Sequence, residues 1–315
     1  MPSPTLPTRV VYDFGAQVAG LQAPLAFGVA QDGEFLVAGR TTNAALYDGK
    51  PGGARFPKSM LDEPHDWSIL RGREGQPPRR LEVRGERGAF AFVQPLGDEV
   101  LLVGARCHWK KDGAERNAVV VDPNGRVVRR FTLGDGIEDV RTTRDTIWAS
   151  YFDEGVFGNY GWATPGPTPI GADGIVWFDL QGERKGAYDA ALAGSDAICD
   201  TYALNVDATG TMWTCFYTEF SVVRLRDNGY TRWPCGVAGA HVLAAVDGRA
   251  LLVGAYRDRA KATVLELPRE GRARVVGEFA VTTPEGTPLP ATRGIACGPE
   301  VYFFDGRRVL TIPVW

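Results

Sequence analysis

The 315-residue chain has little histidine, no excess of one charge and no long apolar run. Its 35 Lys and Arg residues stand against 38 Asp and Glu residues, and neither sign collects in one segment, so the electrostatic signature of a nucleic-acid-binding protein is missing. No stretch reaches the roughly 18 apolar residues of a membrane span, and the first residues lack the pattern of a signal peptide. We therefore expect a cytoplasmic protein that binds neither nucleic acid nor a membrane.

Local catalytic signatures are missing as well. The sequence contains no Gly-x-Ser-x-Gly, no Gly-x-x-x-x-Gly-Lys and no His-Glu-x-x-His motif, so triad hydrolases, P-loop NTPases and zincins have no local support. The cysteines form no Cys-x-x-Cys pair, which removes the usual zinc and redox motifs. We expect five free, mostly buried thiols: Cys107, Cys199, Cys215, Cys235 and Cys297.

What the sequence has is a repeat. An apolar run that ends in small or aromatic residues and leads into a polar loop occurs at residues 36–40, 101–106, 147–154, 212–219, 251–257 and 301–306. A shorter apolar run and a tight turn precede each of these, which indicates an inner β-hairpin. Segments such as NAVVVDPNGRVVRRF indicate a second, outer hairpin, and 39 Gly and 21 Pro supply frequent chain reversals. Four antiparallel strands per unit follow.

Six four-stranded units predict an all-β, six-bladed β-propeller that occupies residues 1–315 as a single domain. The last unit stops after its third strand, whereas residues 8–15 form a strand that has no unit of its own. We expect the N-terminal strand to pair with the C-terminal blade and close the ring, because this satisfies two open sheet edges.

The region between Tyr47 and Phe90 holds two candidate outer hairpins for blade one, at residues 43–58 and 66–85. The sequence does not choose between them. Either choice leaves an insertion of about residues 48–78, with Met60–Trp67 in a loop on the face that carries the blade-to-blade connections, here called the top face.

Top-face loops converge at the mouth of a propeller's central channel, where ligands bind most often. Asp200, His241 and Glu138 are the candidate catalytic residues there, and Glu138, Asp200 and Asn205 are candidate ligands of a hard divalent cation such as Ca²⁺. Asp139, Tyr202 and Arg293 are candidate ligand-binding residues. The alternative is that these polar groups pair with one another, with Arg87, or with water in a polar channel.

A long top-face loop at residues 152–174 is rich in aromatic residues. It could wall a ligand site, or fold over the propeller and cover its own aromatic side chains. Together with the segment CHWKKDG it adds six candidate ligand-binding residues: Asp153, Asn159, Tyr160, Trp162, His108 and Trp109. His65, His108 and His241 are all predicted in top-face loops, where imidazole is a common base or metal ligand.

The six-unit pattern resembles propellers of the gluconolactonase and regucalcin kind, together with NHL-repeat and strictosidine-synthase-like groups. The resemblance covers the whole chain as architecture. In the lactonase group it implies a divalent cation at the channel centre, held by Glu, Asn and Asp, that helps to open a sugar lactone; Glu138, Asn205 and Asp200 are the corresponding candidates here. The family's usual Glu in the first blade has no match near PLAFGV.

Two hypotheses for function follow. In the first, the channel mouth binds a small molecule and supports cation-assisted hydrolysis or isomerisation, as in a lactonase. In the second, the protein is a non-catalytic scaffold whose exposed loop aromatics, Trp109, Phe157 and Trp162, contact a protein partner.

Overall fold

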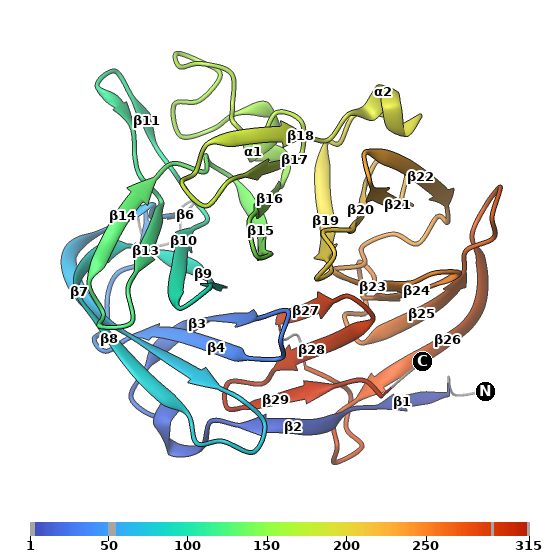
Figure 1. Ribbon diagram of the computed structural model, residues 1–315, viewed down its shortest axis with the longest axis horizontal. Coiled ribbons are helices and arrows are strands. Elements are labelled where there is room, and N and C mark those ends of the chain that lie inside the picture. The colour runs from blue at the N-terminus through green and yellow to red at the C-terminus, as the bar shows by residue number, and fades with distance from the viewer. Residues whose placement is uncertain (1–3, 50–54, 291–292, 314–315) are drawn as a thin grey trace. The chain divides into compact units, whose positions relative to one another are not determined.

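The structure, a computed structural model, describes residues 4–49, 55–290 and 293–313, and the chain forms strands along most of its length (Figure 1). Six antiparallel sheets are the blades of a six-bladed β-propeller, which confirms the predicted fold class. The chain divides into two compact units of three blades each: a first unit, Phe14–Ala187, and a second unit, Tyr188–Trp315 with Met1–Asp13.

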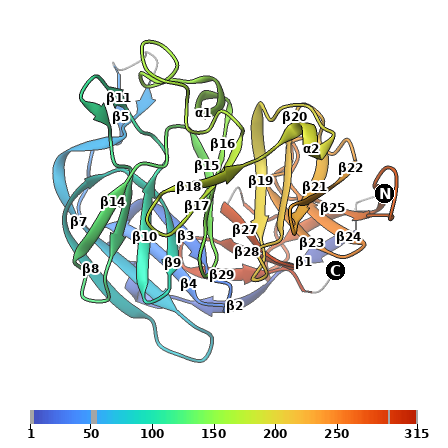
Figure 2. The ribbon, with the colours of Figure 1, turned by 45° about the horizontal axis from the view of Figure 1, so that its top comes forward.

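The first unit holds blades one to three (Figure 2). Blade one comprises β3 (Gln22–Val29), β4 (Phe35–Arg40), β7 (Met60–Gly72) and β8 (Arg79–Gly88). Blade two comprises β9 (Phe90–Leu96), β10 (Glu99–Gly104), β13 (Ala118–Val121) and β14 (Val127–Phe131). Blade three comprises β15 (Ile137–Thr142), β16 (Ile147–Tyr151), β17 (Ile175–Phe178) and β18 (Arg184–Ala187). Two short pairs lie in loops: β5 (Tyr47–Asp48) with β6 (Phe56–Pro57), and β11 (Trp109–Lys110) with β12 (Gly113–Ala114).

The second unit holds blades four to six. Blade four comprises β19 (Asp200–Val206), β20 (Met212–Tyr217), β21 (Ser221–Arg226) and β22 (Gly229–Pro234). Blade five comprises β23 (Val242–Val246), β24 (Arg249–Val253), β25 (Lys261–Glu266) and β26 (Arg274–Thr282), with β1 (Thr5–Pro7) parallel to β26. Blade six comprises β27 (Arg293–Cys297), β28 (Glu300–Phe304) and β29 (Arg308–Thr311), and β2 (Arg9–Asp13) completes it.

Helices are short: η1 (Gly15–Val18), α1 (Asp153–Phe157) and α2 (Ala190–Ala193). Within the described ranges, no helix has the length and apolarity needed to cross a bilayer.

The six repeated runs coincide with the second strand of every blade, and the core explains why they are apolar. β13 is buried along its whole length, and β10 is buried from Val100 onward, because blade two packs against a neighbouring blade on both faces. In the first unit, Leu101 and Val103 of blade two pack with Val140 and Ile147 of blade three, while the other face of blade two packs on blade one. In the second unit, equivalent clusters join blades four to five and five to six.

The N-terminal strand closes the last blade, as predicted. β2 runs antiparallel to β29, with Arg9 opposite Thr311 and Tyr12 opposite Val309. The guanidinium of Arg307 forms two 2.8 Å hydrogen bonds with the Asp13 carboxylate at the end of this pair. Blade six therefore takes its outermost strand from the other end of the sequence.

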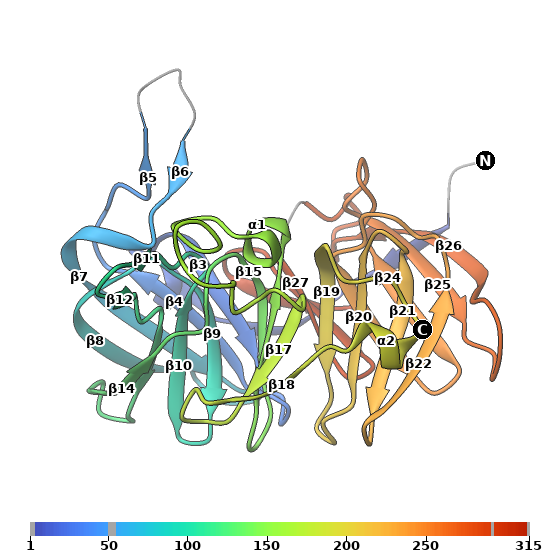
Figure 3. The same cartoon turned by 90° about the horizontal axis from the view of Figure 1, so that it is seen from above.

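The structure settles the ambiguity in blade one and corrects one prediction. Residues 66–85 provide the outer hairpin, because β7 pairs with β4 and β8. Residues 43–58 instead include the short β5–β6 pair, which stands out from the blade (Figure 3). Met60–Trp67 was expected in a loop but belongs to β7, a strand of 13 residues that extends beyond β4, so His65 lies in a strand.

Candidate functional site

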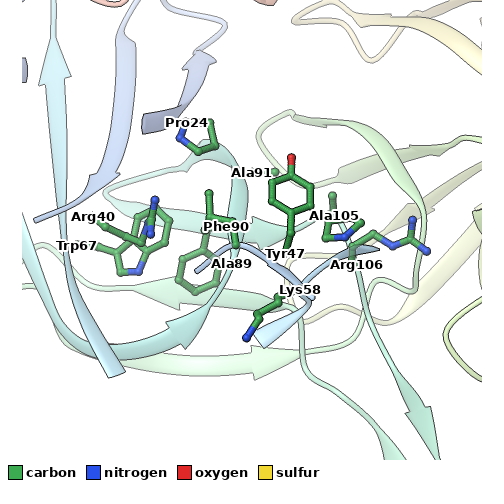
Figure 4. Close-up of a pocket in the computed structure, with 12 residues that line it drawn as sticks. Pro24, Arg40, Tyr47, Lys58, Trp67, Ala89, Phe90, Ala91, Ala105 and Arg106 are labelled. Carbon is green, nitrogen blue, oxygen red and sulfur yellow. The ribbon is translucent and has the colours of Figure 1, made fainter. Parts of the chain in front are cut away.

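The first unit contains a cavity of about 160 Å³ between blades one and two, under the β5–β6 pair (Figure 4). Trp67 and Phe90 form an aromatic wall, with ring centroids 5.0 Å apart. Three basic side chains also line the cavity: Arg40, Lys58 and Arg106. In the close-up, Arg40 and Trp67 lie at one side and Arg106 at the other. A mainly apolar hollow with a few polar groups is the usual form of a small-molecule site.

The positions of these residues follow from the repeat. Arg40 is the last residue of β4, and Arg106 comes two residues after β10, the equivalent strand of the next blade. Trp67 lies opposite Arg40 in the β4–β7 register. Phe90 begins β9, and Lys58 follows β6. The ends of neighbouring blades thus bring two arginines to one top-face hollow.

Arg40 is buried, with 2% of its surface exposed. Its Nη2 donates a 2.9 Å hydrogen bond to the Ala23 carbonyl oxygen. Its Nη1 is buried and has no hydrogen-bond partner among the described residues, and the same holds for Nε1 of Trp67. Within the described part of the chain, no carboxylate forms an ion pair with Arg40. Burial lowers the pKa of Arg40 from its ordinary value, but a guanidinium keeps its charge at any physiological pH.

The other two cations are neutralised by carboxylates. Lys58 Nζ lies 3.2 Å from Asp48 and 2.5 Å from Asp62. Arg106 pairs with Asp135 at 2.8 Å and with Glu154 at 2.5 Å. The cavity therefore presents one uncompensated positive charge, that of Arg40, together with two buried donors in need of an acceptor.

The aromatic loop at residues 152–174 packs beside this cavity. The Tyr160 ring lies under the Arg106 guanidinium, 4.0 Å from centroid to Cζ, and its hydroxyl donates to the Pro57 carbonyl oxygen at 2.5 Å. Trp162 is 5% exposed and donates from Nε1 to the Cys107 carbonyl oxygen at 2.8 Å. Tyr160 and Trp162 thus make packing contacts within the first unit, and their role in ligand binding stays a prediction, whereas Phe157 is 62% exposed.

The remaining candidates of this region are held by local contacts. Asp153 Oδ1 accepts from the Glu154 amide, and Asn159 Oδ1 accepts from the Tyr160 amide, both at 2.7 Å. The His108 ring centroid lies 4.4 Å from that of Tyr160. The Trp109 amide donates to the Tyr160 carbonyl oxygen at 2.9 Å.

The residues predicted at the channel mouth come from both units. Glu138 and Asp139 lie in β15 of the first unit, where Asp139 forms a 2.6 Å ion pair with Arg141. The second unit carries four of them at or just before the start of inner strands: Asp200, Tyr202, His241 and Arg293. Their convergence on a ligand stays a prediction. Among the described residues, no three His, Cys, Asp or Glu side chains group closely enough to hold a metal ion.

Two of the candidate cation ligands, Asp200 and Asn205, sit at opposite ends of β19. Five residues of strand separate their Cα atoms by roughly 16 Å. Asn205 is fully buried, donates from Nδ2 to the Gly298 carbonyl oxygen at 2.7 Å and accepts the Gly298 amide at 3.0 Å. Its carboxamide therefore ties blade four to blade six.

Sequence reasoning missed Arg40, Lys58 and Arg106 as members of a site. A signal for two of them existed, because the runs LVAGR and LLVGAR place an arginine at or near the end of the same strand of adjacent blades. Nothing in the sequence pattern indicated that Arg40 would be left without a carboxylate.

Comparisons with known proteins assign neither a family nor a function to this chain. No protein-family model matches the chain, and no curated protein matches it. Among solved structures it is similar to a virginiamycin B lyase from Staphylococcus aureus, at 12% identity and a TM-score of 0.46 over 93% of this chain and 80% of that one. It is also similar to a chain of a mitotic checkpoint complex, at 8% identity and a TM-score of 0.48 over 100% of this chain and 98% of that one. A PQQ-bound aldose sugar dehydrogenase from Streptomyces coelicolor is similar at 12% identity and a TM-score of 0.43, over 96% of this chain and 97% of that one. At these values, none of the three supplies a function for this chain.

Proposed function

We propose that the protein binds a small organic monoanion, a carboxylate on a compact apolar body, in the cavity between blades one and two. The observation that carries this proposal is Arg40, a buried guanidinium whose Nη1 has no hydrogen-bond partner and which forms no ion pair with the described residues. A buried charge without a partner costs several kcal/mol, and a bound carboxylate would offset that cost.

The ligand class follows from charge, donors and size. One uncompensated cation favours a single negative charge over a dianion. Arg40 Nη1 and Trp67 Nε1 are two donors that suit the two oxygens of a carboxylate. An apolar cavity of about 150 Å³ accommodates a benzene ring. A benzoate-sized molecule therefore fits the volume, and the faces of Trp67 and Phe90 suit its ring.

The side chains that line this cavity are suited to bind and orient a ligand, so the function that we propose is recognition of that ligand. Catalysis by Asp200, His241 and Glu138 with a divalent cation, in a lactonase-like hydrolysis or isomerisation, stays a separate proposal for the channel mouth. A protein partner and cytoplasmic location likewise stay predictions from the sequence.

Isothermal titration with benzoate and its neutral isostere benzamide tests the proposal. We expect benzoate to bind and benzamide to bind at least tenfold more weakly, because benzamide lacks the charge that Arg40 pairs with. The variant Arg40→Met should abolish benzoate binding. The control Arg129→Gln removes an equal charge from a half-buried pair with Glu99, outside the cavity, and should leave binding unchanged. Equal affinity for both probes, or unchanged binding in Arg40→Met, would refute the proposal.

Stability supplies a second measurement, which also shows that the variant folds. Replacing an unpaired buried charge with an apolar side chain should leave the free energy of unfolding unchanged or raise it. Arg40→Met should therefore melt no lower than the wild type without ligand. Benzoate at 100 times its dissociation constant should stabilise only the wild type, by about 2.7 kcal/mol.

A further inference from the structure

A second hollow in the first unit lies outside the cavity described above, along the outer edges of blades one and two. It is an open groove of about 630 Å³ between β8 and the turn that joins β13 to β14. Three arginines line it: Arg80 and Arg84 from β8, and Arg126 from the turn. Two carboxylates, Glu82 and Glu86, line it as well.

Both carboxylates are already bound. Glu82 accepts from Arg80 Nε at 2.5 Å and from the Ser68 hydroxyl at 2.8 Å. Glu86 is 5% exposed and accepts from Arg130 Nη2 at 2.6 Å. Their charges are therefore balanced by arginines at the same edge.

The side chains of Arg84 and Arg126 are available to bind an anionic partner. Neither side chain forms an ion pair or hydrogen bond with any described residue. The backbone amide of Arg126 and, more weakly, its charge lower the pKa of Asp122. Arg84 and Arg126 are both exposed. The groove thus presents two unpaired guanidinium groups from facing elements, which suits an anionic partner.

The groove is not only charged. Leu81 and Val127, on its two sides, are partly buried against the core between blades one and two. A single phosphate would use the two arginines and leave this apolar surface open. A peptide that carries both acidic and apolar side chains would use both, because each side of the groove offers one unpaired arginine and one apolar side chain.

We propose that the groove between β8 and the β13–β14 turn docks an extended acidic peptide of a partner protein, with carboxylates on Arg84 and Arg126 and apolar side chains against Leu81 and Val127. This inference is independent of the anion cavity at Arg40, because the two hollows share no lining residue.

Fluorescence anisotropy with a labelled eight-residue peptide of alternating Glu and Leu tests the inference. We expect saturable binding that weakens as salt rises from 50 to 300 mM, since salt screens exposed charges. The double variant R84Q/R126Q should bind at least tenfold more weakly. The matched control R226Q/R269Q removes two arginines from the second unit and should bind like the wild type.

Three results would overturn the inference: no binding of the Glu peptide, equal binding of a peptide with Gln in place of Glu, or an unchanged affinity in R84Q/R126Q with its fold intact by circular dichroism. Complete displacement of the peptide by 5 mM inorganic phosphate would also overturn it, because it would mark a site for a free anion and not for a peptide.

Discussion

Arg106 and Asp135 form a buried, bidentate ion pair that joins blades two and three. Arg106 Nε donates to Asp135 Oδ1 at 2.9 Å and Nη2 donates to Oδ2 at 2.8 Å, with side chains 6% and 2% exposed. The Cys107 amide donates to the same carboxylate at 2.8 Å. Arg106 Nη1 reaches Glu154 on the other side, whose side chain is 40% exposed. One guanidinium therefore has a buried partner and an exposed partner.

This asymmetry predicts very different costs for two similar substitutions. Asp135→Asn leaves the buried Arg106 charge poorly compensated and should lower the free energy of unfolding by about 3 kcal/mol. Glu154→Gln weakens a half-exposed pair and should cost less than about 1 kcal/mol. Urea denaturation of both variants measures the difference. A Glu154 variant as unstable as the Asp135 variant would contradict the assignment of Asp135 as the structural partner.

Much of the fold was readable from the sequence because the propeller repeats one local rule. Each blade's second strand is largely buried on both faces, so it appears as a continuous apolar run, and tight turns join other strands of the blade. At Asp122, Asp179 and Asp207 the aspartate carboxylate accepts from backbone amides two and four residues later, which fixes the turn. The sequence did not identify the outer hairpin of blade one, because β7 is unusually long and because residues 43–58 carry turn signals as strong as those of the true hairpin.

The candidate site was much less readable, for a physical reason. Sequence can place Arg40 and Arg106 at equivalent strand ends, but it cannot show that Asp135 and Glu154 neutralise one of them and leave the other alone. Asn205 shows the same limit from the other side. A polar residue on an inner strand resembles a ligand, yet its carboxamide is occupied by the Gly298 backbone.

Asn205 should therefore behave as a structural residue. Asn205→Ala leaves both the buried amide and the carbonyl of Gly298 without their partner and should lower the free energy of unfolding by about 2–4 kcal/mol. Asn205→Asp should also destabilise, because a carboxylate cannot donate to the Gly298 carbonyl. Thermal melts with calcium and with EDTA check the alternative. A calcium-dependent stabilisation of the wild type that both variants lose would support a ligand role instead.

The N-terminal strand should be indispensable to the second unit. Deleting residues 1–13 removes β1 and β2, uncovers the edge of β29 and takes away the buried ring of Tyr12, which is 7% exposed. We expect a loss of at least about 3 kcal/mol in the free energy of unfolding. Deletion of residues 1–3 is the control and should change little. Calorimetry on both shortened chains measures this, and equal melting temperatures would contradict the closing role of β2.

His241 should make stability depend on pH. Burial lowers the pKa of His241 to about 4, and the charge of Arg259 adds to the effect. Its Nδ1 is buried and has no hydrogen-bond partner in the part of the chain that the structure describes, so the folded protein favours the neutral ring. The unfolded chain takes up the proton near pH 6.5, so the stability that His241 contributes is complete above that pH and is lost as the pH falls toward 4.

The size of this effect can be tested by removing the titrating group. Between pH 7 and pH 5 the wild type should lose about 2 kcal/mol more in its free energy of unfolding than His241→Gln, which has no proton to take up. Urea titrations of both proteins at the two pH values give this difference directly, and titrations common to the two chains cancel in it. If both lost the same stability, or the wild type lost less, then the His241 ring would be charged or solvated in the folded state, and its burial against Gly254 would be the wrong description.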